Sequence, residues 1–329
     1  MGRRLAIALA GLLAVALLVV GAVALLGRDG SDGDAAGPGP TGTATPGPTG
    51  TATATGESRA VDLYLAVGDS LAAGYQPDLP GDHTDREGGY AGVVRDALTA
   101  PGGGHPELVN TGCPGETAES FLTGGRCEYP EGSQVAAAEQ VLAGRADEGA
   151  GVLVTVQLGA NDVQRCVRLD RQQASVDEAC VTAGLQQVGT ALPEALTRLK
   201  AAAPQAEVVV LDYYNPFVVA ALLGGTFEPL AARSQQAQTE LNALIDRTAQ
   251  ESGDAVARVG AAFAAADLPP TTGASGATGT STTRVPLGPI CSWTWMCADP
   301  PDIHATTEGY RVMADQVLAA RGEGGAGPG

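Results

Sequence analysis

Short apolar runs alternate with longer amphipathic segments from about residue 60 to residue 320. The strand-like runs cover residues 63–67, 107–109, 152–158, 207–211 and 255–259. The helix-like segments cover residues 90–98, 134–142, 184–203, 231–250 and 304–320. The run VLVTVQL at 152–158 is apolar on both faces, which is typical of a strand buried in a parallel sheet. The alternation predicts an α/β fold in three layers, with a central parallel sheet between two layers of helices.

The first residues of the chain follow a different pattern. Residues 5–26 are apolar or small and carry no charge, and Arg3 and Arg4 precede them. We expect residues 1–28 to be a membrane anchor or a cleaved signal peptide, and the length of the run favours the anchor. The two arginines would keep the N-terminus in the cytoplasm and place the rest of the chain outside it.

Composition sets the remaining boundaries. Residues 29–58 are rich in Gly, Pro, Thr and Ala, so they cannot bury apolar surface and are expected to form a disordered linker. Residues 59–321 would then form the folded domain, and residues 322–329 a flexible tail. Within the domain, residues 267–285 are rich in Gly, Ser and Thr and are expected to form a mobile loop.

The net charge excludes one class of partner, and the cysteines indicate disulfides. The net charge is -18, which argues against binding to nucleic acid. The chain has six cysteines, and an even number in an exported protein indicates disulfides. Several pairings are possible, and the simplest joins neighbours along the chain: Cys113 to Cys127, Cys166 to Cys180, and Cys291 to Cys297. No pair has the spacing of a zinc site and the three histidines are scattered, so we expect no metal.

Candidate catalytic residues follow the strands. In an open parallel sheet the site lies at the carboxyl ends of the strands. Ser70 follows the first strand and is a candidate nucleophile, although a serine there can also cap a helix. Gly115, in a turn after the second strand, can present a backbone N–H, and Asn161, after the third, a side-chain amide. Together with the N–H of Ser70 they would supply three donors to one oxyanion.

His304 is the candidate base, because a serine hydroxyl is inert without one. His83 and His105 lie in loops away from strand ends and are expected to be surface residues. Taken alone, each candidate can also have a purely structural role: Asn161 can be a turn residue, and His304 can be a loop residue before a helix. The order and placement of the four candidates favour acyl transfer through a serine.

Four short blocks carry a resemblance to a known family. The sequences GDSL at 68–71, NTGCPGET at 110–117, GAND at 159–162 and the block around His304 resemble the four blocks of the GDSL, or SGNH, hydrolases. The resemblance spans roughly residues 61–317. The cysteine pairs and the DYYNPF segment at 212–217 are similar to those of secreted actinobacterial lipases and esterases.

The resemblance implies a flavodoxin-like three-layer α/β/α fold and ester hydrolysis through a serine acyl-enzyme. By position it implies Ser70 as the nucleophile, His304 as the base, and Gly115 and Asn161 as oxyanion donors. It also implies that the enzyme needs no cofactor.

The last block departs from the family pattern. The family usually has an aspartate three residues before the histidine, and Pro301 occupies that position here. A carboxylate beside the histidine holds the imidazole tautomer and stabilises its charged form. We expect Asp302 to do this for His304, with Asp299 or a backbone carbonyl of the Trp293–Pro301 loop as alternatives.

The sequence therefore predicts an extracytoplasmic serine ester hydrolase, a lipase or esterase. We expect a monomer that acts on a small-molecule or lipid ester and contacts the membrane through its N-terminal segment. An acyltransferase, a thioesterase or a carbohydrate O-deacetylase fits the same blocks, and a catalytically inactive tethered binding module is the alternative from another class. The apolar segment Phe217–Leu223 is expected either to line an acyl pocket or to pack in the core.

Overall fold

The computed structural model describes residues 60–145, 151–169, 174–265 and 287–322. Its main sheet is parallel and has five strands in the order β2-β1-β3-β6-β7. The strands are β1 (Leu63–Gly68), β2 (Glu107–Asn110), β3 (Val152–Gln157), β6 (Glu207–Leu211) and β7 (Ala255–Ala257). Counted along the chain, this is the 2-1-3-4-5 order of flavodoxin-like folds. The predicted fold class is confirmed, and β7 ends two residues earlier than expected.

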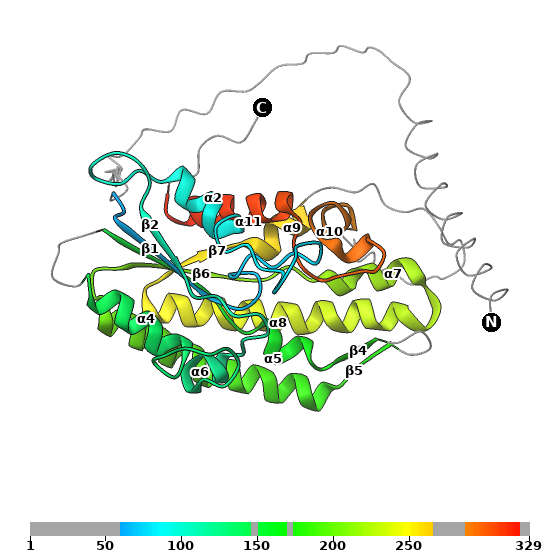
Figure 1. The fold of residues 1–329 in the computed structure, drawn as a ribbon. Coiled ribbons are helices and arrows are strands. Elements are labelled where there is room, and N and C mark those ends of the chain that lie inside the picture. The colour runs from blue at the N-terminus through cyan, green and yellow to red at the C-terminus, as the bar shows by residue number, and fades with distance from the viewer. Residues whose placement is uncertain (1–59, 146–150, 170–173, 266–286, 323–329) are drawn as a thin grey trace, which may run out of the picture. The chain divides into compact units, whose positions relative to one another are not determined.

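Helices cover both faces of this sheet. In Figure 1, α4, α6 and α8 lie on one face, and α2 and α11 lie on the other. The longer helices are α2 (Tyr90–Ala97), α4 (Gln134–Ala143), α6 (Glu178–Ala202), α8 (Glu228–Ser252) and α11 (Thr307–Ala320). The shorter ones are α3 (Ala118–Thr123), α5 (Ala160–Gln164), α7 (Ala220–Leu223), α9 (Val259–Ala265), α10 (Leu287–Trp293), η1 (Pro216–Val219), η2 (Gly225–Phe227) and η3 (Trp295–Cys297).

Three helix starts differ from the prediction: α8 begins three residues earlier, at Glu228, and capping residues decide the other two. Helix α6 begins at Glu178, six residues before the predicted start, since the Asp177 side chain accepts a hydrogen bond from the backbone N–H of Cys180. Helix α11 begins at Thr307, because the Thr306 side chain caps it. His304 therefore lies in the loop before the helix and not in its first turn.

Two features of the C-terminal side of β3 and β6 were missed or misjudged. The strands β4 (Val167–Leu169) and β5 (Ala174–Val176) form an antiparallel hairpin, and strands of three residues are too short for an alternating pattern to reveal. The segment Phe217–Leu223 neither packs entirely in the core nor lines the pocket that contains Ser70. Leu222 and Leu223 are 57% and 61% exposed.

The three disulfides join the neighbouring cysteines: Cys113 to Cys127, Cys166 to Cys180, and Cys291 to Cys297. This is the simplest of the pairings that the sequence allowed. Among the described residues, no helix is long and apolar enough to cross a membrane. The predicted anchor, linker, mobile loop at 267–285 and nearly all of the tail lie outside the described residues.

Candidate active site

Ser70 lies two residues beyond the carboxyl end of β1, in a turn that only glycine can begin. Gly68 has a φ of 137°, and a Cβ there would stand 2.2 Å from the backbone oxygen of Gln157 on the neighbouring strand. The buried side chain of Gln134, the first residue of α4, brackets Gly68: its Oε1 accepts from the Gly68 N–H at 2.6 Å and its Nε2 donates to the Gly68 oxygen at 3.0 Å. The turn that presents Ser70 is thus fixed from both sides.

The neighbouring Asp69 is a buried carboxylate that joins this turn to the end of β6. One oxygen accepts from the backbone N–H of Leu71 at 2.9 Å, and the other accepts from the Tyr213 hydroxyl at 2.7 Å. Burial raises the pKa of Asp69 to about 6, although these hydrogen bonds and the nearby His304 oppose the rise.

Ser70, His304 and Asp302 form a chain of short contacts. The Ser70 Oγ lies 2.8 Å from His304 Nε2, and His304 Nδ1 lies 2.6 Å from Asp302 Oδ1. The same Asp302 oxygen accepts from the His304 backbone N–H at 2.9 Å. Of the three groups considered from the sequence, Asp302 is therefore the one in contact with the imidazole.

Electrostatics keep Asp302 in its charged form. Burial raises its pKa, but the hydrogen bonds from His304 and the electrostatic attraction of the His304 and His83 side chains outweigh that effect, so the pKa lies below its usual value. A carboxylate on Nδ1 and a hydroxyl on Nε2 suit an imidazole that accepts the serine proton and is stabilised once it is charged.

The sequence did not reveal an aromatic side chain that packs on His304, nor the histidine next to that side chain. The Tyr75 ring packs on the His304 ring with 4.1 Å between centroids, and the His83 ring lies 5.6 Å from the Tyr75 ring. His83 was expected to be a surface residue, but it is half-buried and has a left-handed backbone with φ of 59°. No motif marks either residue, whereas His105 is exposed as expected.

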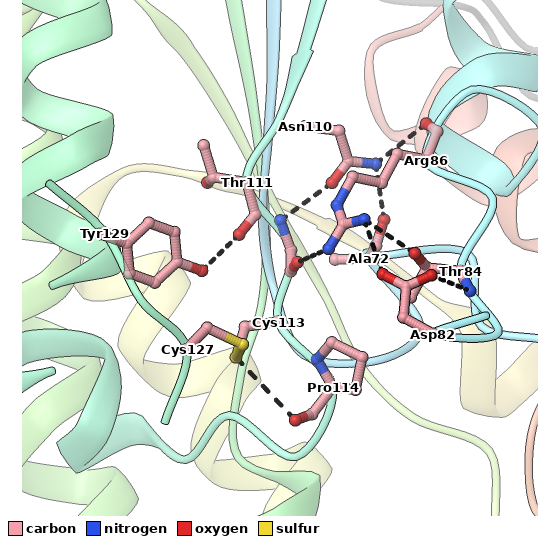
Figure 2. A network of polar contacts seen from close by, with 11 residues as sticks. Ala72, Asp82, Thr84, Arg86, Asn110, Thr111, Cys113, Pro114, Cys127 and Tyr129 are labelled. Carbon is pink, nitrogen blue, oxygen red and sulfur yellow. Dashed lines mark hydrogen bonds and ion pairs between the residues drawn. A yellow bond between two sulfur atoms is a disulfide. The ribbon is translucent and has the colours of Figure 1, made fainter. Parts of the chain in front are cut away.

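A polar network fastens the loop that carries Tyr75 and His83 to the end of β2 (Figure 2). The Arg86 guanidinium donates to the Gly112 oxygen at 3.2 Å and to the Thr84 hydroxyl at 2.8 Å. The Asn110 amide donates to the backbone oxygens of Ala72 and Arg86 at 2.8 and 3.1 Å. These hydrogen bonds connect the loop of Tyr75 and His83 to the turn that carries Ser70 and to the start of the segment that carries Gly115.

Asn161 and the Gly115 turn lie next to each other. Asn161 is in the first turn of α5, and its Nδ2 donates to the backbone oxygen of Glu116 at 2.9 Å. Gly115 has a φ of 81°, a conformation that favours glycine. Asn161 lines a small pocket together with Ser70 and His304, whereas Gly115 is not among the lining residues.

A buried carboxylate completes this region. Glu116 accepts from the Gln134 Nε2 at 2.9 Å and from the Ser120 hydroxyl, and burial raises its pKa against the effect of these bonds. Gln134 therefore connects the serine turn with the turn that carries Gly115. Among the described residues, no group of three or more His, Cys, Asp or Glu side chains is suited to hold a metal ion.

The family model of GDSL-like lipases and acylhydrolases matches residues 66–312, well over half of the chain. The chain belongs to this family. The match includes the serine turn, the Gly115 and Asn161 segments and the histidine loop, and the protein is a GDSL-type hydrolase.

Several solved structures are similar to this GDSL-type hydrolase at low identity. LAE5, an alpha/beta hydrolase enzyme from the metagenome of Lake Arreo, shares 19% identity with a TM-score of 0.48, covering 82% of this chain and 100% of that one. The extracellular lipase of Streptomyces rimosus shares 20% identity with a TM-score of 0.48, covering 79% of this chain and 100% of that one. The phospholipase A1 of Streptomyces albidoflavus shares 20% identity with a TM-score of 0.47, covering 79% of this chain and 100% of that one. No curated protein matches the chain in sequence.

Proposed function

We propose that this GDSL-type hydrolase is a serine esterase that acts outside the cytoplasm on carboxylic esters. The observation that carries the proposal is the contact chain from the Ser70 Oγ through His304 to Asp302, with distances of 2.8 and 2.6 Å. A serine hydroxyl becomes a nucleophile when an adjacent base can take its proton, and a carboxylate on the far side of that base stabilises the charge that results.

In the first half of the reaction, His304 Nε2 takes the Ser70 proton while the Ser70 Oγ attacks the carbonyl carbon of the ester. The carbonyl oxygen becomes an oxyanion that accepts from the Ser70 N–H, the Gly115 N–H and the Asn161 amide. Each such donor contributes about 3 kcal/mol in the transition state. The C–O bond of the ester then breaks, and the departing alcohol takes the proton from His304.

Water completes the cycle by the same steps. His304 removes a proton from a water molecule that attacks the acyl-serine, and a second oxyanion forms in the same position. Its collapse releases the acid and returns the proton to the Ser70 Oγ. These steps use only side chains and backbone groups of the chain and one water molecule.

The disulfides support a location outside the cytoplasm. All six cysteines are paired, and such bonds persist in oxidising compartments. The uncharged segment at 5–26, preceded by two arginines, is the part of the sequence that would hold the enzyme at a membrane or direct its export.

A fluorophosphonate probe tests the proposal on the full-length protein. The wild type should be labelled, and labelling should vanish in Ser70→Ala but persist in Ser175→Ala, which replaces an exposed serine on β5. Hydrolysis of p-nitrophenyl acetate should fall by a factor on the order of 10⁴ in Ser70→Ala and in His304→Ala. A folded wild type that is neither labelled nor active on short or long esters would instead support a binding module, and acyl transfer to an added sugar in preference to water would support a transferase.

A further inference from the structure

The peptide between Pro114 and Gly115 accepts a hydrogen bond on its carbonyl oxygen, on the side opposite its N–H. A peptide unit is planar, so the Pro114 C=O and the Gly115 N–H point in opposite directions and turn together. This inference rests on the proposed function, in which the Gly115 N–H donates to the oxyanion. A group that binds the Pro114 oxygen therefore also sets the direction of an oxyanion donor.

Arg126 is that group. Its Nε donates to the Pro114 oxygen at 2.9 Å. Its guanidinium also lies against Gly115, because a Cβ at that position would stand only 2.3 Å from a terminal nitrogen of Arg126 and 2.6 Å from the Nε. The arginine thus covers the turn and limits rotation of the Pro114–Gly115 peptide.

The backbone on the C-terminal side of Arg126 is attached to the segment that carries Pro114 and Gly115. The next residue, Cys127, is bonded to Cys113, directly before Pro114 (Figure 2). Two residues further on, the Tyr129 hydroxyl donates to the Thr111 oxygen at 2.7 Å. These two attachments hold the stretch that bears Arg126 beside the turn that it contacts.

Among the described residues, the charge of Arg126 forms no ion pair, although it acts on the nearby Glu116 carboxylate and lowers its pKa against the larger effect of burial. The Arg126 side chain is exposed. The nearby Glu116 carboxylate instead accepts from Gln134 and Ser120. A hydrogen bond from a charged donor to a carbonyl polarises the amide, which strengthens its N–H as a donor.

We propose that Arg126 is a positioning residue of the oxyanion hole, which fixes the Pro114–Gly115 peptide and polarises its N–H toward the developing oxyanion. Arg126 would act on the hole and not on the substrate. Its contribution should therefore be the same for neutral and for anionic esters. Recognition of an anionic substituent by the guanidinium is the competing role, and it predicts a loss that is confined to anionic substrates.

The test compares Arg126→Ala and Arg126→Lys with wild type in the full-length enzyme. In Arg126→Ala we expect kcat for a neutral p-nitrophenyl ester to fall by about 10- to 100-fold, less than for loss of a whole donor, with KM changed by less than about 2-fold. The rate of Ser70 labelling by the fluorophosphonate should fall in parallel. Because the site is exposed, added methylguanidinium should restore part of the kcat of Arg126→Ala but none of that of Asn161→Ala. Arg126→Lys should retain an intermediate kcat, since it keeps a charged donor.

The control is Arg311→Ala, which removes an exposed arginine that pairs with Glu308 on α11 and should leave kcat unchanged. An unchanged kcat in Arg126→Ala, beside an inactive Ser70→Ala, would overturn the role of Arg126 and leave the esterase intact. A loss limited to anionic esters would also overturn it, as would a loss that methylguanidinium does not reverse and that accompanies a lower Tm. A wild type that hydrolyses no ester would overturn the proposed function itself.

Discussion

Asp302 contacts His304 through a single oxygen that serves two groups. Its Oδ1 accepts from the His304 backbone N–H and lies beside His304 Nδ1. An aspartate side chain readily bonds the backbone N–H two residues later, and here that local turn also aims the carboxylate at the ring. A spacing of two residues therefore suffices where the family usually has three, and Pro301 can occupy the usual position.

We predict that Asp302→Asn lowers kcat by about 10²-fold or more, because the amide cannot stabilise the charged imidazole as a carboxylate does. Asp299→Asn is the matched control, since Asp299 is exposed and has no contact with His304 in the structure. Steady-state kinetics on p-nitrophenyl acetate would measure both. A large loss of kcat in Asp299→Asn, with little change in Asp302→Asn, would contradict the orienting role of Asp302 and assign it to Asp299.

The candidate site residues that the sequence could point to are those that stand in a recognisable short block of sequence. Ser70, Asn161 and His304 each stand in a short block at a strand end or before a helix, so their proximity follows from the fold. Arg126 and Gln134 have no such mark, because their contacts depend on how a loop and a helix return to the turns after β1 and β2. The sequence limited the partner of His304 to a few nearby groups, and the structure places Asp302 in contact with its imidazole.

At the scale of elements, the side chain of Gln134, the first residue of α4, attaches this helix to the sheet. Ser133 caps the helix by accepting from the Ala136 N–H, and the next residue, Gln134, then points at Gly68. Its amide also donates to Glu116 and to the Tyr129 hydroxyl. One side chain thus satisfies buried polar groups from several segments.

We predict that Gln134→Leu lowers the free energy of unfolding by about 3 kcal/mol or more. The leucine leaves the Gly68 N–H and the Oε2 of Glu116 without the Gln134 amide, and each buried group costs about 1–3 kcal/mol when its hydrogen bond is lost. Gln140→Leu changes an exposed residue of the same helix and should alter the stability by less than about 0.5 kcal/mol. Urea unfolding of both variants measures the difference, and equal values for the two would contradict the role assigned to Gln134.

Elements were predictable where periodicity is sustained over several turns or a full strand. The strands at 63–68, 152–157 and 207–211 are continuous apolar runs and were located to within a residue. The first turn of α6 was missed because its residues, EACVTA at 178–183, show no apolar stripe. Two contacts define that turn: the Asp177 side chain accepts from the Cys180 N–H within the turn, and the disulfide joins Cys180 to Cys166 outside the helix.

At the scale of the whole molecule, three buried aspartates lie on the carboxyl side of the sheet. Asp69 follows β1, Asp162 lies in the helix after β3, and Asp212 follows β6. Burial raises the pKa of each to about 6, although each accepts hydrogen bonds from backbone N–H groups. The unfolded chain loses these protons near pH 4, so between about pH 4 and 6 the folded state binds more protons than the unfolded state. These groups therefore make the domain less stable as the pH rises through that window.

Asp69→Asn isolates one of these contributions, because asparagine does not titrate. We predict that the stability of wild type relative to this variant falls by about 2 kcal/mol between pH 4 and pH 7, because the folded-state pKa is about two units higher and the unfolded carboxyl is already half ionised at pH 4. Urea unfolding at several pH values, with the disulfides intact, measures the trend. A constant or rising difference would mean that Asp69 is already ionised in the folded protein at pH 4.

Each disulfide closes within one connection of the fold. Cys113 and Cys127 lie between β2 and α4, Cys166 after α5 is bonded to Cys180 in the first turn of α6, and Cys291 in α10 is bonded to Cys297 in η3. No bridge links two strands of the five-stranded sheet or encloses one, and the Cys166–Cys180 bridge encloses only the hairpin of β4 and β5. Each bridge can therefore form as soon as its own short stretch of chain is available. Oxidation can accordingly proceed in any order without trapping the sheet in a wrong topology, and the chain needs no earlier bridge as a template for a later one.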